Sequence, residues 1–432
     1  MTERLLQFIW QFQYFNKQSL STIDGTLLYI LHPGQYNTNQ GPDFSEGKIK
    51  LGNTTWAGNI ELHVKASDWY NHNHQADKNY QNIILHVVWQ NDMEIKDSTG
   101  LQLQTLELQP FVPVIMLQKY TRLMQHTGFV PCESFLPALS GIAWFSWKER
   151  LAIERLMRKS KEVLQLLKES NSHWEEVFWW MLARNFGIPV NANVFQEVSK
   201  SVSINVLAKH KNQLHQLEAL LLGQAGLLNA EFKEDYPLML QKEYHFLAKK
   251  YSLKQVNKAP SFLRMRPANF PTIRLAQLAM LIHQSSHLFS LIKETKTIAG
   301  IQGMFTVTAN DYWNYHYCFD EPTPYSHKTL GKQMANNIII NTVIPILFAY
   351  GVDRNEPQFK DMPVRWLLQL PPENNTITNK WKEREVLNQN ALDSQALIEL
   401  KNNYCNKRLC LDCAVGNKIL PQDSTGNSSK KP

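Results

Sequence analysis

Side chains that can bind a metal or move a proton gather in one stretch near the N-terminus. Glu61, His63 and Lys65 alternate with apolar residues, and alternate residues of a β-strand share one face. Asp43 precedes a glycine–asparagine turn that predicts a hairpin folding Asp43 back beside Glu61. Two such carboxylates suit Mg²⁺, and His63 or Lys65 would orient the attacking water. The stretch predicts a Mg²⁺-dependent phosphodiesterase site; the alternative is a solvated strand face.

The order of these residues resembles the motif of the PD-(D/E)xK phosphodiesterase superfamily, which includes restriction enzymes and recombination exonucleases. Pro42 and Asp43 match its Pro-Asp pair, Glu61 matches the glutamate of the next strand, and Glu3 matches a glutamate often present on a preceding helix. The sequence departs from the motif at the lysine position, which holds His63. The resemblance implies a restriction-endonuclease-like domain that cleaves nucleic acid, and the departure leaves a degenerate, non-catalytic version as the alternative.

Histidines provide a second possible metal site in the same region. His72, His74 and Asp77 lie within six residues, and His63 is close to them in the sequence. Imidazole and carboxylate groups with this spacing can bind a transition metal, which predicts a metallohydrolase as an alternative function. The other interpretation is a polar surface loop in which these side chains make local hydrogen bonds.

Three cysteines near the C-terminus have a spacing typical of metal ligands. Cys405, Cys410 and Cys413 have the spacing C-x4-C-x2-C, and Cys132 is available as a fourth ligand. Thiolates with this spacing predict a Zn²⁺ ion or an iron–sulfur cluster, and the alternative is a set of buried or idle thiols. Some nucleases of the superfamily above resemble this layout, although their first cysteine precedes the nuclease core, whereas Cys132 follows it.

Three arginines surround a predicted helix start in the sequence FLRMRPANFPTIR. Arg264, Arg266 and Arg274 together with the helix N-terminus predict contacts to phosphate groups. The alternative is that they pair with acidic groups and carbonyl oxygens between helices. The sequence has no Gly-x-Ser-x-Gly, GxGxxG or Walker motif, which argues against a serine hydrolase and a nucleotide-binding loop of those types.

The elements that must position these residues change character along the chain. Alternating and β-branched segments dominate the first part, and apolar residues at helical spacing dominate from about residue 143. We therefore predict an α+β protein with a strand-rich α+β domain over residues 1–120 and a mainly helical domain over residues 121–417. Residues 418–432 are expected to be a disordered tail, because the final stretch PQDSTGNSSKKP has no apolar side chains to bury.

Composition and apolar segments indicate the kind of partner and the cellular location of the protein. The net charge of +7 permits an anionic partner such as nucleic acid, and the five cysteines in 432 residues do not suggest a disulfide framework. No secretory segment opens the chain, and the most apolar run, residues 338–351, is interrupted by Asn341 and Pro345. We therefore expect a cytoplasmic protein that does not insert into a membrane.

Several separate segments together resemble one uncharacterised bacterial family held as a domain of unknown function. These segments are GPDF, W-x-G-N-I-E-L-H, S-D-W-x3-H-x-H, ILHVVW, ARNFG, GQAG, RPANFPTIRLAQLA, NTVIPILFAYG and YC-x4-C-x2-C. They occur in order over nearly the whole chain, and the family supplies no activity. The leading hypothesis is therefore a metal-dependent nuclease or nucleic-acid-processing protein, and the alternatives are a binding or scaffold protein and the histidine-site metallohydrolase.

Overall fold

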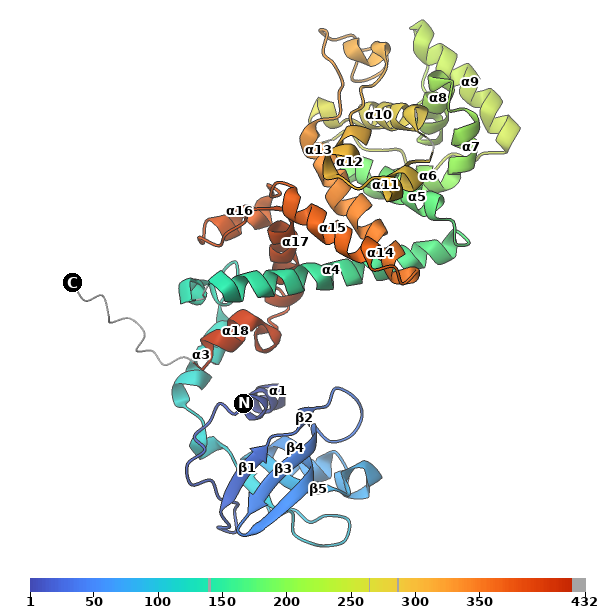
Figure 1. The fold of residues 1–432 in the computed structure, drawn as a ribbon. Helices are drawn as coiled ribbons and strands as arrows, with labels where there is room; N and C mark the ends of the chain where they lie inside the picture. Colours follow the sequence, from blue (N-terminus) through green and yellow to red (C-terminus); the bar gives the residue numbers. More distant parts are fainter. Residues whose placement is uncertain (139–140, 264, 286, 422–432) are drawn as a thin grey trace, which may run out of the picture. The chain divides into compact units, whose positions relative to one another are not determined.

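The computed structural model describes residues 1–138, 141–263, 265–285 and 287–421, and it forms two compact units (Figure 1). The first unit combines Met1–Ala143 with Lys401–Pro432, and the second comprises Trp144–Leu400. Strands occupy the first unit and helices dominate the second, which confirms the predicted α+β class.

The first unit is built on a six-stranded mixed sheet. Its strands are β1 (Leu28–His32), β2 (Gln35–Tyr36), β3 (Phe44–Leu51), β4 (Thr54–Lys65), β5 (Ile83–Gln90) and β6 (Thr105–Glu107). The order is β1-β3-β4-β5-β6, with β2 also pairing with β3. The strands β1, β3 and β4 pair antiparallel, whereas β4–β5 and β5–β6 pair parallel.

The hairpin between β3 and β4 has the turn that the sequence predicted. Leu51 pairs with Thr54 across Gly52, whose φ of +55° is a conformation that favours glycine. The register shifts between Phe44 and Gly47, so the start of β3 is bent relative to β4. On the other side of β4, Glu61 is the pairing partner of His86 in β5.

Helices cover this sheet and connect its parallel strands. The helix α1 (Glu3–Gln11) begins at Thr2, whose side chain accepts a hydrogen bond from the backbone of Leu5, and it packs against β4 (Figure 1). Trp10 is fully buried, so α1 is fixed by apolar packing. The connection from β4 to β5 contains α2 (Asp68–Asn71), η1 (His74–Ala76) and η2 (Lys78–Tyr80). Trp69 of this connection lies in a cluster with Val88 and Ile95.

The C-terminal segment packs into the first unit, which the predicted boundary at residue 120 did not include. The segment contains η9 (Cys410–Asp412) and α18 (Ala414–Ile419), and α18 contacts η4 (Glu133–Ala138). The helix α3 (Val114–Gln125) follows η3 (Gln109–Phe111). The guanidinium of Arg408 donates to the carbonyl oxygens of Leu123, in the last turn of α3, and of His126, directly after it. Contacts between residues about 280 positions apart leave no periodic signal in the sequence.

The predicted tail over residues 418–432 begins too early. Ile419 and Leu420 are 2% and 0% exposed, because they complete the apolar side of α18. Residues 422–432 of that prediction lie outside the described residues.

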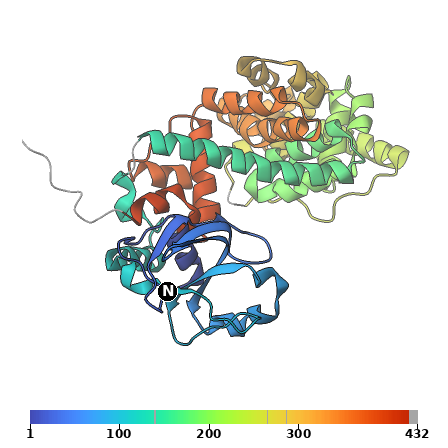
Figure 2. The ribbon, with the colours of Figure 1, turned by 60° about the horizontal axis from the view of Figure 1, so that its bottom comes forward.

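The second unit is helical throughout its described part, apart from isolated β-bridges (Figure 2). Its helices are α4 (Gly141–Glu169), α5 (Trp174–Phe186), α6 (Ile188–Ser201), α7 (Ile204–Lys209), α8 (Leu214–Gln224), α9 (Asp235–Tyr251), η5 (Pro267–Asn269), α10 (Pro271–Gln284), α11 (Leu288–Glu294), α12 (Ile298–Met304), η6 (Asp311–Tyr315), α13 (Lys332–Ile338), the π-helical η7 (Ile339–Val343), α14 (Ile344–Asp353), α15 (Gln358–Gln369), α16 (Thr376–Lys382) and α17 (Ala391–Glu399). The start of α4 belongs to the first unit, and the π-helical η8 (Leu400–Cys405) begins at the last residue of the second unit and continues in the first.

The most apolar run is longer as a helix than the sequence indicated. Residues Lys332–Asp353 form one helix, because the N–H of Ile344 bonds to the carbonyl of Ile339 and this π-helical turn shifts the hydrogen-bond ladder before Pro345. By length and composition this helix is able to span a membrane, but 78% of its most apolar window is buried inside the protein. Such burial is expected of a helix in a protein core.

Candidate functional site

The first unit brings together carboxylates from separate elements. Glu3 lies in the first turn of α1, Asp43 immediately precedes β3, and Glu61 lies within β4. The backbone N–H of Asp43 donates to Oε2 of Glu61 at 2.9 Å, and the N–H of Leu62 donates to Oδ2 of Asp43 at 3.2 Å. The hairpin thus folds Asp43 back beside Glu61.

Gln7 links the helix to this pair of carboxylates. It lies one helical turn after Glu3 on α1, and its Nε2 donates to Oδ1 of Asp43 at 2.8 Å and to Oε1 of Glu3 at 3.4 Å. The hydroxyl of Tyr36 in β2 donates to Oε1 of Gln7 at 3.3 Å. The amide of Gln7 is therefore held between two carboxylates, and it fixes the position of Glu3 relative to Asp43.

The carboxylates repel one another in a poorly hydrated place. Burial, followed by the neighbouring charge of Asp43, raises the pKa of Glu61, which is only 5% exposed. Burial is also the main reason that the pKa of Asp43 is raised, and the charge of Glu3 adds to the effect. Burial raises the pKa of Glu3 as well. Among the described residues, no lysine or arginine forms an ion pair with Glu3, Asp43 or Glu61.

Imidazole rings converge on the same place from β4, β5 and their connection. Potential ligand atoms of His63, His72 and His74 all lie within 4.8 Å of one another. Oε1 of Glu61 is 3.4 Å from Nε2 of His74 and 3.7 Å from Nε2 of His63. On the inner side, Nδ1 of His63 is hydrogen-bonded to Nε2 of His86 at 2.8 Å. We name Glu3, Asp43, Glu61, His63, His72 and His74 the carboxylate–histidine cluster.

Burial keeps His63 and His74 of the cluster, and His86 behind them, in the neutral form. Burial, reinforced by the neighbouring histidines, lowers the pKa of His63 to about 2, and burial lowers the pKa of His74 to about 4. His86 is fully buried, and its pKa is lowered to about 3. Neutral imidazoles do not neutralise the carboxylates, but their ring nitrogens offer lone pairs.

Aromatic side chains hold the histidines in place. The ring of Tyr80 stacks on His74 with centroids 3.8 Å apart, and the edge of Trp69 meets the rings of His63 and His74. His72 is the exposed member of the cluster, and its Nδ1 lies 3.1 Å from Nε2 of His63. The cluster therefore has a fixed inner wall and one edge that solvent or a ligand can reach.

The donor set of the cluster fits a divalent cation. The carboxylates are partly or fully buried together, and no lysine or arginine among the described residues pairs with them; a cation that binds there relieves this charge imbalance. Carboxylate oxygens suit Mg²⁺ and Mn²⁺, whereas the imidazole nitrogens favour Zn²⁺, Fe²⁺ and similar ions. A metal bound by His63 Nε2 would use the hydrogen bond to His86 as its outer support.

Two other residues of the sequence prediction lie away from the cluster. The side chain of Lys65 is exposed. Against the effect of burial, hydrogen bonds from Ser67 and, last, the charge of Lys65 lower the pKa of Asp92. Asp77 caps η2 by accepting a hydrogen bond from the N–H of Asn79, and it is not part of the close group of histidines. Strand alternation alone predicted the position of Lys65, but β4 ends at that residue and the chain turns away.

The three arginines predicted to bind phosphate belong to the second unit. Arg264 lies outside the described residues, and Arg266 is exposed. Arg274 is 8% exposed in the first turns of α10, where its guanidinium donates to side-chain oxygens of Asn269 and Gln277. Its partners are therefore neutral amides, and a role in phosphate binding stays a prediction.

The four cysteines predicted to bind a metal all lie in the first unit as thiols. Cys132 precedes η4 and Cys413 precedes α18, and these two helices pack together. Burial, then the neighbouring Cys413 and Cys410, raises the pKa of Cys132 to about 12. Burial likewise raises the pKa of Cys405, and Cys413, Cys132 and Cys410 add to the rise. These thiols interact electrostatically, but among the described residues only the three histidines have their ligand atoms within 4.8 Å of one another. A metal bound by the cysteines stays a prediction.

Gln7, Tyr36 and Tyr80 contact members of the cluster, although they are not among the predicted site residues. The position of Gln7 was predictable from the sequence, because residues i and i+4 of a helix lie on one face and Glu3 is a predicted site residue. Tyr36 and Tyr80 lie in loops and short segments whose positions depend on the folded sheet.

Comparison with known proteins identifies a family but no activity. A family model described as "Protein of unknown function (DUF2851)" matches residues 3–376. No curated protein and no solved structure matches the chain. The match covers the carboxylate–histidine cluster and most of the second unit.

Proposed function

Since the chain belongs to the DUF2851 family, whose function is unknown, we propose from its cluster that it is a divalent-metal-dependent phosphodiesterase acting on nucleic acid. One observation carries the proposal: Glu3, Asp43 and Glu61 come from three elements and are packed together without a lysine or arginine partner among the described residues. Buried carboxylates of this kind are typical of a site that binds a cation.

The chemistry follows from the positions of these groups. A bound divalent cation would polarise a phosphoryl oxygen and make a bound water more acidic. Asp43 and Glu61 supply oxygen ligands, and Gln7 orients Asp43 by donating to its Oδ1. His72 lies at the exposed edge, where it can accept a proton from water approaching a phosphodiester. The net charge of +7 is compatible with a polyanionic substrate.

Cleavage assays with the full chain test this proposal. Single- and double-stranded DNA and RNA, and bis(p-nitrophenyl) phosphate, are incubated with Mg²⁺, Mn²⁺, Zn²⁺ or EDTA. We expect cleavage with a divalent cation and none with EDTA. Asp43→Asn and Glu61→Gln should abolish it, whereas Glu94→Gln, an exposed carboxylate of the same unit, should leave it unchanged. Absence of metal-dependent cleavage across the panel would reject the proposal and favour a binding or scaffold role.

A second candidate, a hydrolase that uses a transition metal, is favoured by the convergence of His63, His72 and His74. Imidazole ligands bind Zn²⁺ and Co²⁺ more readily than Mg²⁺. The visible absorption of added Co²⁺ distinguishes the two candidates. A signal that disappears in His74→Ala but persists in Asp43→Asn would assign the metal to the histidines, and the opposite pattern would assign it to the carboxylates.

A further inference from the structure

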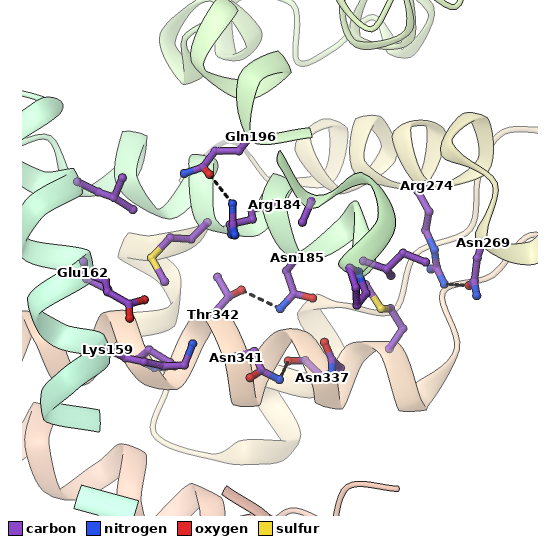
Figure 3. A pocket seen from close by; sticks show the side chains of 18 of the residues that line it. Lys159, Glu162, Arg184, Asn185, Gln196, Asn269, Arg274, Asn337, Asn341 and Thr342 are labelled. Atoms are coloured by element: carbon purple, nitrogen blue, oxygen red, sulfur yellow. Dashed lines mark hydrogen bonds between the residues drawn. The ribbon is translucent and has the colours of Figure 1, made fainter. Parts of the chain in front are cut away.

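The second unit contains a cavity of about 880 Å³ that is remote in the sequence from every residue of the cluster. Helices α4, α5, α6, α10, α13 and α14 line it, together with η5 and the π-helical η7. Figure 3 shows Lys159 and Glu162 on α4, Arg184 on α5 and Arg274 on α10 around this space. The volume is within the usual range of pockets that bind small molecules, about 300–1,000 Å³.

Arg274 is a buried cation without an acidic partner. It is 8% exposed, and within the part of the chain that the structure describes no carboxylate forms an ion pair with it. Its Nη1 donates to Gln277 at 3.0 Å, its Nη2 donates to Asn269, and its buried Nε has no hydrogen-bond partner. Burial lowers the pKa of Arg274 to about 10. A guanidinium placed among neutral amides retains its full charge for an anion.

Lys159 and Arg184 line the same cavity, and neither forms an ion pair with a carboxylate in the part of the chain that the structure describes. Burial, then repulsion from Arg155, lowers the pKa of Lys159 to about 8, although Glu162 acts in the opposite direction. The carboxylate of Glu162 is 3.3 Å from Arg158 and 63% exposed, so its ion pair lies with another residue. Nη1 of Arg184 donates to the amide oxygens of Asn193 and Gln196, both at 2.8 Å. The lining therefore has an excess of positive charge.

The backbone around the cavity departs from regular geometry. Ile188 has a φ of +46°, which is rare for a β-branched residue, and it lines the cavity directly after Gly187. The π-helical η7 presents Asn341 and Thr342 to the cavity, and Nδ2 of Asn185 donates to Oγ1 of Thr342 at 3.1 Å (Figure 3). Strained residues and π-helical turns are frequent at ligand-binding sites.

From these observations we propose that the cavity binds a phosphorylated organic molecule of nucleotide size. Lys159, Arg184 and Arg274 would contact the phosphate groups. The amides of the lining offer both donors and acceptors to a sugar or base, and apolar side chains can cover a ring. The lining amides include Asn185, Gln196, Asn269, Gln333, Asn337 and Asn341.

Calorimetric titration of the full chain in EDTA tests this site, because EDTA removes the divalent cations that the cluster would use. The probes are AMP, ATP and GTP, with adenosine, citrate and inorganic phosphate as comparators. We expect the nucleotides to bind and adenosine to bind much more weakly. Arg274→Gln and Lys159→Met should each weaken binding about 10- to 100-fold, as expected for losing a charged hydrogen bond.

One further lining variant and two controls complete the test. Arg184→Gln changes an exposed side chain of the lining and should weaken nucleotide binding without affecting folding. Arg354→Gln changes an exposed arginine of the same unit outside the lining and should leave binding unchanged. Asp43→Asn should also leave it unchanged. Failure of all nucleotides to bind, equal binding of citrate, or unchanged affinity in Lys159→Met and Arg184→Gln would overturn the proposal.

Discussion

Replacing Asp43 with asparagine should stabilise the metal-free protein at alkaline pH. Burial disfavours the ionised form of Asp43, the charge of Glu3 adds to this effect, and no lysine or arginine among the described residues pairs with Asp43. Asparagine keeps an oxygen that can accept the hydrogen bond of Leu62, and it removes one negative charge. The variant therefore removes the cost of burying this charge and keeps the hydrogen bond from Leu62, while it loses the one that Gln7 donates to Oδ1.

The size of the effect follows from the pKa of Asp43. Burial is the main cause that raises this pKa from its ordinary value of 3.8 to about 6. Because the folded-state pKa is the higher one, the stabilisation from protonated Asp43 is complete below pH 3.8 and is lost as pH rises through about 6. Each pKa unit corresponds to about 1.4 kcal/mol, so the full loss is about 3 kcal/mol, and solvent around this half-buried group reduces it to about 1–2 kcal/mol.

Urea unfolding followed by tryptophan fluorescence measures this difference between pH 4 and pH 8. In EDTA, the wild type should lose stability over this range, and Asp43→Asn should lose less and become the more stable protein at pH 8. Added Mn²⁺ should reverse the order, because binding to the folded state stabilises the wild type by RT ln(1 + [Mn²⁺]/Kd). Glu94→Gln is the matched control and should follow the wild type.

The reasoning fails if the wild type in EDTA is equally stable at pH 5 and pH 8. It also fails if Asp43→Asn is the less stable protein at pH 8 and Mn²⁺ leaves this order unchanged. Either result would mean that the carboxylates are satisfied within the protein, as in a purely structural site.

Three further predictions concern the groups around the carboxylates and the cysteines. Gln7→Ala should weaken metal affinity about 10- to 100-fold in titrations, because it removes the group that orients Asp43; unchanged affinity would exclude this role. His72→Ala should lower the rate of metal-dependent cleavage by about 10²–10⁴-fold, because His72 accepts a proton from water, and an unchanged rate would exclude this role. Elemental analysis of anaerobically purified protein should find about one zinc or iron site per chain that Cys410→Ser removes, and a metal content unaffected by Cys410→Ser would exclude the cysteine site.

The sequence determined the class of the fold and the local elements, because these depend on short-range patterns. Strand alternation and the glycine–asparagine turn predicted the β3–β4 hairpin, which places Asp43 beside Glu61. The same residues could be selected from their types and spacing alone. The change from alternating to helical spacing near residue 143 predicted the helical second part.

The tertiary structure decided which of the selected residues meet, because their contacts join positions far apart in the chain. It placed His86 behind His63 through parallel pairing of β4 with β5, and it moved Lys65 away where β4 ends. It also packed the cysteine-bearing C-terminal segment into the first unit, where Arg408 bonds to the carbonyl of Leu123, whereas the predicted boundary at residue 120 had placed this segment in the helical domain.

The cavity of the second unit was not predictable, since its lining comes from helices spread over almost 200 residues. The charge of Arg274 is visible in the sequence, but its burial among neutral amides depends on how those helices pack. The residue types show which chemical groups the chain contains. Only long-range packing decides which of these groups are buried away from water and lack an oppositely charged partner.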